Sequence, residues 1–265
     1  MTKTFTKILV ISVTLGSVFL SKNSTADENT TVSLGSSIST SLHGFDDNRK
    51  RTSSNFDIRP SFTLKNGLSV STSLNVTKNL ENERELTLND SYISLGKKLY
   101  SLDNGLSLSA SMVFGLPISK YSRNDSTLRT SVKVSPRLSY SYKKLSSGLG
   151  LSYRQNFHAS EVTVSGDSNT QSAYTTYGDI GYGLSDQISI GASASYTKSY
   201  TYRKNERDSY SIEQNISYSP NANLSFSFGH AIGGNVLSVN GRDSNIEIFD
   251  PENSSVYLGL RFIHR

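Results

Sequence analysis

The sequence contains no cysteine and no tryptophan, and only 35% of its residues are apolar. Without cysteine the chain has no disulfide, no thiolate metal ligand, no cysteine nucleophile and no lipoprotein anchor. Beyond the N-terminus no run of about 18 apolar residues occurs, which argues against a helical membrane span. The spacings typical of metal sites, phosphate-binding loops and nucleotide fingerprints are also missing. The sequence therefore predicts no cofactor and no metal.

Residues 1–26 have the features of a secretory signal peptide. Two lysines, an apolar segment over residues 8–20 and small residues before a cleavage point after Ala26 are typical of such a segment. We expect residues 27–265 to form the mature protein. Cleavage would remove three lysines and no acidic residue, so the net charge would fall from +5 to +2. The basic composition therefore gives no argument for a nucleic-acid partner.

Residues 128–157 show a pattern that the rest of the mature chain repeats. Apolar residues such as Val132, Val134 and Leu138 occupy alternate positions, and Ser, Lys or Arg stands between them. Because side chains alternate across a β-strand, this pattern predicts two strands, each with one apolar and one polar face. About twelve such strands are predicted along the chain. Their approximate ranges are 31–42, 56–65, 68–76, 86–99, 106–116, 128–142, 149–157, 173–184, 188–196, 210–218, 224–228 and 255–264.

The connections between these strands alternate between short and long. Short turns are predicted near Asn66, Asn104, Lys144, Asp186 and Asn221. Long polar connections are predicted near Asp46, Glu81, Ser122, Gly166, Asn205 and Gly241. Tyrosines gather near both ends of the strands, as they do at the two interfaces of a membrane. This rhythm predicts an all-β, antiparallel, up-and-down transmembrane barrel with short periplasmic turns and longer extracellular loops. A soluble β-sandwich does not require it.

Two local features depart from regular strands. Leu86 and Ile93 belong to opposite phases of one predicted strand, which indicates a bulge between them or an offset start of the strand. Pro60 and Pro136 lie inside predicted strands. Each should remove one hydrogen bond from the ladder or mark a bulge, because proline has no N–H to donate.

The inward faces of most predicted strands carry Ser, Gly, Thr, Ala and Asn. Such small side chains cannot fill a twelve-stranded barrel, so we expect water in the lumen. A loop that folds inward would change this. The longest connection, residues 231–254, contains Ile246, Ile248 and Phe249 and is the candidate plug or constriction.

Charged residues on the predicted inward face are few and mostly basic. A basic column is expected from Arg129, Lys133, Arg137 and Arg154 on two neighbouring strands. Further luminal charges are Arg59, Arg261, Asp57, Asp179 and Glu213, with Asp90 if its strand has the matching phase. Charges inside a pore set its ion preference, so one interpretation is a channel that favours anions. The other is that the bases pair with the acids and only stabilise the barrel.

The histidines are the candidates for catalysis. His43, His158, His230 and His264 are present, and His230 falls on the lipid-facing phase. Ser254 and Asp208, on neighbouring strands, could approach it to form a Ser-His-Asp set. No motif around these residues resembles a barrel lipase or protease. We therefore interpret His230 as an interfacial residue and the protein as non-enzymatic.

The chain resembles bacterial outer-membrane barrel proteins as a class. The resemblance rests on the whole-chain rhythm and on the aromatic-rich ending, residues 255–265, in which three residues follow Phe262. In size and luminal bases it is similar to twelve-stranded porins for acidic oligosaccharides. The resemblance implies outer-membrane lipids, small hydrophilic solutes and the barrel assembly machinery as partners. It favours a passive, water-filled, porin-like channel in the outer membrane, with a preference for anions. The alternatives are a non-conducting surface protein with partner-binding loops and a lipase-like enzyme.

Overall fold

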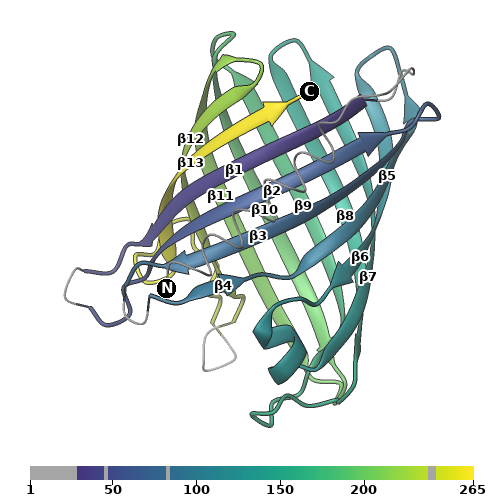
Figure 1. Cartoon of the computed structure of the whole chain (residues 1–265). Coiled ribbons are helices and arrows are strands. Elements are labelled where there is room, and N and C mark those ends of the chain that lie inside the picture. Colours follow the sequence, from purple (N-terminus) through teal and green to yellow (C-terminus); the bar gives the residue numbers. More distant parts are fainter. Residues whose placement is uncertain (1–28, 45–46, 82–83, 238–242) are drawn as a thin grey trace, which may run out of the picture.

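The computed structural model describes residues 29–44, 47–81, 84–237 and 243–265, and these form an antiparallel barrel (Figure 1). The predicted signal peptide, residues 1–26, lies outside the described residues. The strands are β1 (Asn29–Ser41), β2 (Thr52–Thr63), β3 (Leu68–Asn79), β4 (Leu86–Leu88), β5 (Ser91–Ser101), β6 (Leu106–Leu116), β7 (Leu128–Tyr142), β8 (Leu145–His158), β9 (Thr170–Gly183), β10 (Ile188–Thr201), β11 (Glu206–Asn221), β12 (Leu224–Asn235) and β13 (Ser254–His264). A short π-helical turn, η1 (Tyr121–Asp125), precedes β7.

Strands that are neighbours in the sequence pair with each other, except that β5 pairs with β3 instead of β4, and β1 also pairs with β13, which closes the sheet. All thirteen strands belong to this one sheet. The three-residue β4 pairs with β3 alone and continues into β5, so twelve strands complete the circle. The predicted all-β, up-and-down barrel is confirmed.

The apolar side chains point away from the lumen. Leu149 and Leu151 on β8 are 60% and 56% exposed, and Ile180 on the neighbouring strand is 54% exposed. Among the described residues, the buried apolar side chains are only Ala173, Tyr210 and Ile232. The apolar residues therefore form an outer band that suits lipid, rather than a closed core.

Tight turns join the strands at one end of the barrel. Gly67 and Gly105 adopt positive φ angles of 77° and 87°, which favour glycine. At Gly105 a side chain would also collide with the backbone oxygen of Ser141, 1.9 Å from where its Cβ would lie. Val32 near the start of β1 pairs with His264 at the end of β13. Both described ends of the chain therefore lie at the short-turn end, opposite the long loops (Figure 1).

A one-residue bulge separates β4 from β5, as the change of phase predicted. Val76 of β3 lies opposite Leu88, whereas Ser73 lies opposite Tyr92, so one extra residue is accommodated between β4 and β5. Asn89 still donates its backbone N–H to β3. The bulge therefore turns the chain without opening the barrel wall.

The two prolines interrupt the ladder without shifting it. The pairing of β2 with β3 skips Pro60, and the pairing of β7 with β8 skips Pro136, while the register is the same on both sides of each gap. Pro136 still lies opposite Ala110 on the other side of its strand. Each proline therefore removes local pairing on one side only.

Several strands are longer at the loop end than the sequence predicted. β2 begins at Thr52, β10 continues to Thr201, and β12 continues to Asn235. Above the apolar band both faces of a strand can be polar, so alternation no longer marks where the hydrogen-bonded ladder ends. The last connection is consequently residues 236–253 rather than 231–254.

Candidate functional site

The inner wall contains two contacts that reach across a strand. Arg137 on β7 forms an ion pair of 2.7 Å with Asp179 on β9, and it passes over Gly148 of β8. Side chains two strands apart can meet in this way on the concave side of a barrel. A Cβ at Gly148 would lie 2.2 Å from the Arg137 guanidinium, so the glycine makes room for the pair.

A similar contact is made by Tyr257 and Glu213. The Tyr257 hydroxyl on β13 donates a hydrogen bond of 2.5 Å to the Glu213 carboxylate on β11, over Gly229 of β12. The remaining acid of the predicted set, Asp57, forms an ion pair of 2.8 Å with Arg59 on the same strand. Each predicted luminal acid thus already has a partner from the wall.

Lys133 and Arg154 differ from these pairs. They lie directly opposite each other on β7 and β8, so two positive charges are neighbours across the ladder. Neither forms an ion pair with any acid in the described part of the chain. Both line a cavity of about 580 Å³ at the loop end of the lumen, together with Arg207 of β11 and His158 at the end of β8.

The other two predicted bases lie elsewhere. The register of β7 on β8 shifts between Leu128 and Thr130, and Arg129 is the extra residue. Arg129 is exposed and does not line the cavity, although Leu128 beside it does. Arg261 lies opposite Gly35 near the short-turn end of the barrel. The structure therefore brings together Lys133 and Arg154, whereas Arg137 is engaged with Asp179.

Two loops close over the cavity by hydrogen bonding to each other. Asn169, which is 4% exposed, donates its side-chain amide to the backbone oxygens of Ser126 and Ser160, both at 2.9 Å. The contact with Ser126 joins the β8–β9 loop (residues 159–169) to the β6–β7 loop (residues 117–127), and the contact with Ser160 lies within the β8–β9 loop. Sequence reasoning did not identify Asn169, because nothing in a polar loop marks which residue it will contact.

Asp90, at the bulge, fixes the β6–β7 loop to the wall. Its carboxylate accepts the backbone N–H of Ser119 at 2.8 Å and the hydroxyl of Ser122 in η1. Ser119 and Ser122 are both buried. Asp90 lines the cavity, so its side chain faces the lumen. This is the phase in which the sequence counted Asp90 among the luminal charges. Here it acts as an anchor for the loop.

The described residues of the last loop, the candidate plug or constriction, do not enter the lumen. Tyr210 shares the outward face of β11 with Ile216, which is 45% exposed, and its hydroxyl donates to the backbone oxygen of Asn245 at 2.6 Å. Phe249 stacks on His230, at 5.6 Å between ring centroids, on the outward face of β12. The segment therefore folds against the outside of the barrel. Its apolar residues do not enter a polar lumen.

The His230 site does not assemble a Ser-His-Asp set. The Ser254 hydroxyl is 3.0 Å from His230 Nε2, but Ser254 is only 2% exposed. Asp208 lies opposite Val236, whereas His230 lies opposite Gln214, six residues away along β11. That separation corresponds to about 20 Å. The histidine therefore has a serine neighbour, and Asp208 is too far away to orient it.

The described residues contain no group of three or more acidic or histidine side chains that could hold a metal. Within the same residues, no helix is long and apolar enough to cross a membrane.

Several solved structures are similar to this chain in fold. The COG4313 outer membrane channel from Pseudomonas putida F1 matches with a TM-score of 0.62 at 12% identity, over 89% of this chain and 95% of that one. The NanC porin matches with a TM-score of 0.56 at 16% identity, over 87% and 98%. The KdgM porin matches with a TM-score of 0.51 at 12% identity, over 87% and 98%.

These likenesses support the outer-membrane barrel architecture that the sequence predicted. No curated protein matches the sequence. A protein family does match most of it: residues 21–242 fit the family described as "Putative MetA-pathway of phenol degradation", and the chain belongs to that family.

Proposed function

We propose that the protein is a passive, water-filled channel of the outer membrane for small hydrophilic solutes, and that it favours anions. The observation that carries the proposal is the pair of bases, Lys133 and Arg154, that lie opposite each other in the cavity at the mouth without an acidic partner. Arg207 also lines this cavity, so its three bases outnumber its two acids, Asp90 and Asp167.

The physical argument concerns the free-energy cost of this arrangement. Like charges directly opposite each other on neighbouring strands destabilise a sheet. Elsewhere on the wall, Arg137 and Arg59 are neutralised by Asp179 and Asp57. A solute anion in the cavity would provide the countercharge that the wall does not provide at Lys133 and Arg154. Charges that line a narrow passage set ion preference in this way.

The rest of the lumen supports permeation by small hydrophilic molecules. Between the charged residues the inward positions are mostly serine and glycine, as on β1, where Ser33, Gly35, Ser37 and Ser39 share the inward phase. A barrel of twelve strands is wider than one that ordinary side chains fill. Small hydroxyl groups leave that space for water and hydrogen-bond to it.

We also propose how the chain reaches the membrane. Residues 1–26 would direct secretion and be removed, and residues 27–265 would be the barrel. The last strand, β13, would be recognised by the barrel assembly machinery, and outer-membrane lipids would surround the apolar band.

The test is the reversal potential in planar bilayers under a salt gradient. The wild-type protein is expected to be anion-selective, and the double variant K133Q/R154Q is expected to lose most of that selectivity. The matched control is R137Q/D179N, which also changes two charged residues but leaves the net charge of the lumen unchanged. It is expected to keep the wild-type selectivity.

Two outcomes would overturn the proposal. A cation-selective wild-type channel would refute the anion preference. A correctly folded protein that conducts no ions would refute the channel and favour the non-conducting surface protein.

A further inference from the structure

The outer face of the barrel carries a polar pair of side chains among its apolar residues. His230 on β12 and Ser254 on β13 are hydrogen-bonded at 3.0 Å and point to the same side as Phe228, which is 52% exposed, and Leu258, which is 59% exposed. Polar groups that face lipid without cover cost free energy. Something must therefore shield this pair at the outer rim.

The cover is the segment of residues 243–253, which we call the strap. Tyr210 and Ile232 face outward but are only 6% and 2% exposed, so the chain lies over them. The Tyr210 hydroxyl bonds to the backbone of Asn245, and Phe249 lies over the His230 ring. The strap is thus fixed to the outer face of β11 and β12.

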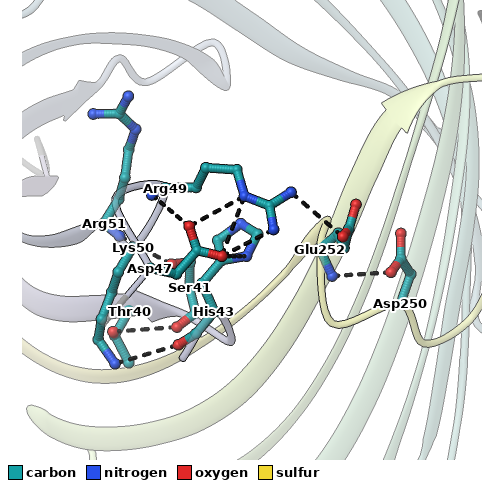
Figure 2. Close-up of polar contacts among 9 residues, drawn as sticks. All are labelled: Thr40, Ser41, His43, Asp47, Arg49, Lys50, Arg51, Asp250 and Glu252. Atoms are coloured by element: carbon teal, nitrogen blue, oxygen red, sulfur yellow. Dashed lines mark hydrogen bonds and ion pairs between the residues drawn. The ribbon is translucent and has the colours of Figure 1, made fainter. Parts of the chain in front are cut away.

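The other end of the strap is held by the β1–β2 loop. Arg49 forms an ion pair of 3.3 Å with Glu252 and a second of 2.9 Å with Asp47 (Figure 2). Within the strap, the Glu252 N–H donates to Asp250 at 2.9 Å. Both ends therefore have partners, and the middle of the strap is presented to its surroundings in a defined orientation.

The middle of the strap exposes apolar side chains. Ile248 is 70% exposed, Phe249 is 60% exposed and Ile246 is 48% exposed. In water such exposure is unfavourable. At the edge of the lipid-facing band it is favourable, because aromatic and aliphatic side chains partition into the boundary between headgroups and acyl chains.

Aromatic rings also gather elsewhere on the outer face. On β8 to β10, Tyr153, Tyr174 and Tyr200 lie next to one another, with ring centroids 4.9 Å and 6.3 Å apart. His230 on β12 lies farther from the loop end, because its ladder partner Gln214 on β11 pairs with Ala192 on β10, eight residues before Tyr200. Phe249 of the strap stacks on this histidine, so the loop adds an aromatic ring to the outer face of β12.

We propose that the strap is a membrane-binding element, and that Ile246, Ile248 and Phe249 bind the acyl-chain boundary of the outer leaflet. The strap would add an aromatic ring to the outer face of β12 and shield His230 and Ser254 from lipid. This inference is independent of whether the barrel conducts.

The experiment uses the absence of cysteine. I248C is labelled with an environment-sensitive fluorophore in the full chain and placed in nanodiscs that hold one barrel each. Ile248 is suitable because it is the most exposed of the three. We expect the probe to emit at a shorter wavelength than a water-exposed probe on the same barrel. We also expect strong quenching by lipids brominated near the headgroup, because interfacial side chains sit about 5–10 Å into this boundary.

The matched control is V164C, an apolar residue that is 76% exposed in the β8–β9 loop over the mouth. It is expected to emit like a water-exposed probe and to be quenched weakly. Equal emission and quenching at both positions would overturn the proposal. A wavelength shift at I248C that appears only when two barrels share a nanodisc would also overturn it, because the occupant would then be a second copy of the chain.

Discussion

The loops over the mouth and the strap leave the same end of the barrel, but they fold to opposite sides of its wall. Ser122 in the β6–β7 loop and Asn169 in the β8–β9 loop are both buried beside a polar cavity. The strap instead places exposed Ile248 and Phe249 outside, beside the lipid-facing band. The comparison shows that a loop at this rim goes to the environment that its side chains prefer. The loops that hydrogen-bond to each other lie over the polar inner side, and the loop with exposed apolar residues lies on the apolar outer side.

The largest expected effect comes from loosening the loops over the mouth. Asn169→Ala removes one buried and one partly buried hydrogen bond and leaves the oxygens of Ser126 and Ser160 without their donor. A loss of about 1–3 kcal/mol would raise the population of the open loops by about 5- to 150-fold. Single-channel recordings are expected to show higher or noisier conductance than the wild type.

The control for this change is Asn253→Ala, which removes an exposed contact with Asp250 in the strap. It is expected to leave the conductance unchanged. If the two variants conducted alike, the loops over the mouth would not restrict the channel, and the contrast between the two kinds of loop would have no functional meaning.

A smaller effect is expected when the strap loses its attachment to β11. Tyr210→Phe keeps the ring but removes the hydroxyl that bonds to Asn245. The cost is expected to be about 0.5–1.5 kcal/mol. Amide hydrogen exchange in residues 243–249 should become faster, while exchange in residues 159–169 stays as in the wild type.

Tyr182→Phe is the comparison variant, because Tyr182 is 48% exposed at the short-turn end. It should not change exchange in the strap. Faster exchange over the mouth in the Tyr210→Phe variant would show that the two loop systems are coupled rather than separate.

The smallest effect concerns pH and the contact between the β1–β2 loop and the strap. The Arg49 side chain, and then its backbone N–H, donate hydrogen bonds to Asp47 and lower the pKa of that carboxyl from its ordinary 3.8 to about 2 (Figure 2). A lowered pKa means that the pair contributes fully above pH 3.8 and is lost as the pH falls through about 2. NMR titration of the Asp47 carboxyl carbon should show its midpoint near pH 2. In the Arg49→Gln variant the midpoint should return towards 3.8.

The architecture could be predicted from the sequence because it depends on local patterns. Alternation places each side chain on one face, and turn residues such as Gly67 mark where strands reverse. The bulge at Asp90 and the gaps at Pro60 and Pro136 were predicted for the same reason. A change of phase and a missing N–H are properties of the residues themselves.

The composition of the lumen was also predicted, but the partners within it were not. Arg137 and Lys133 look alike in the sequence, four residues apart on one face. One meets Asp179 across a glycine, whereas the other lies opposite Arg154. Which base remains without an acid depends on the register between strands, and a register is set by the closed sheet as a whole.

By itself, the sequence determined that this chain is a barrel with an apolar outside, a polar inside and alternating turns and loops, because period-2 alternation and turn chemistry act over a few residues. Only the tertiary structure decided that Lys133 and Arg154 face each other, that Asn169 joins two loops over them, and that Phe249 lies on the outer wall instead of in the lumen. These outcomes depend on contacts between residues far apart in the chain, and the closure of the barrel fixes them.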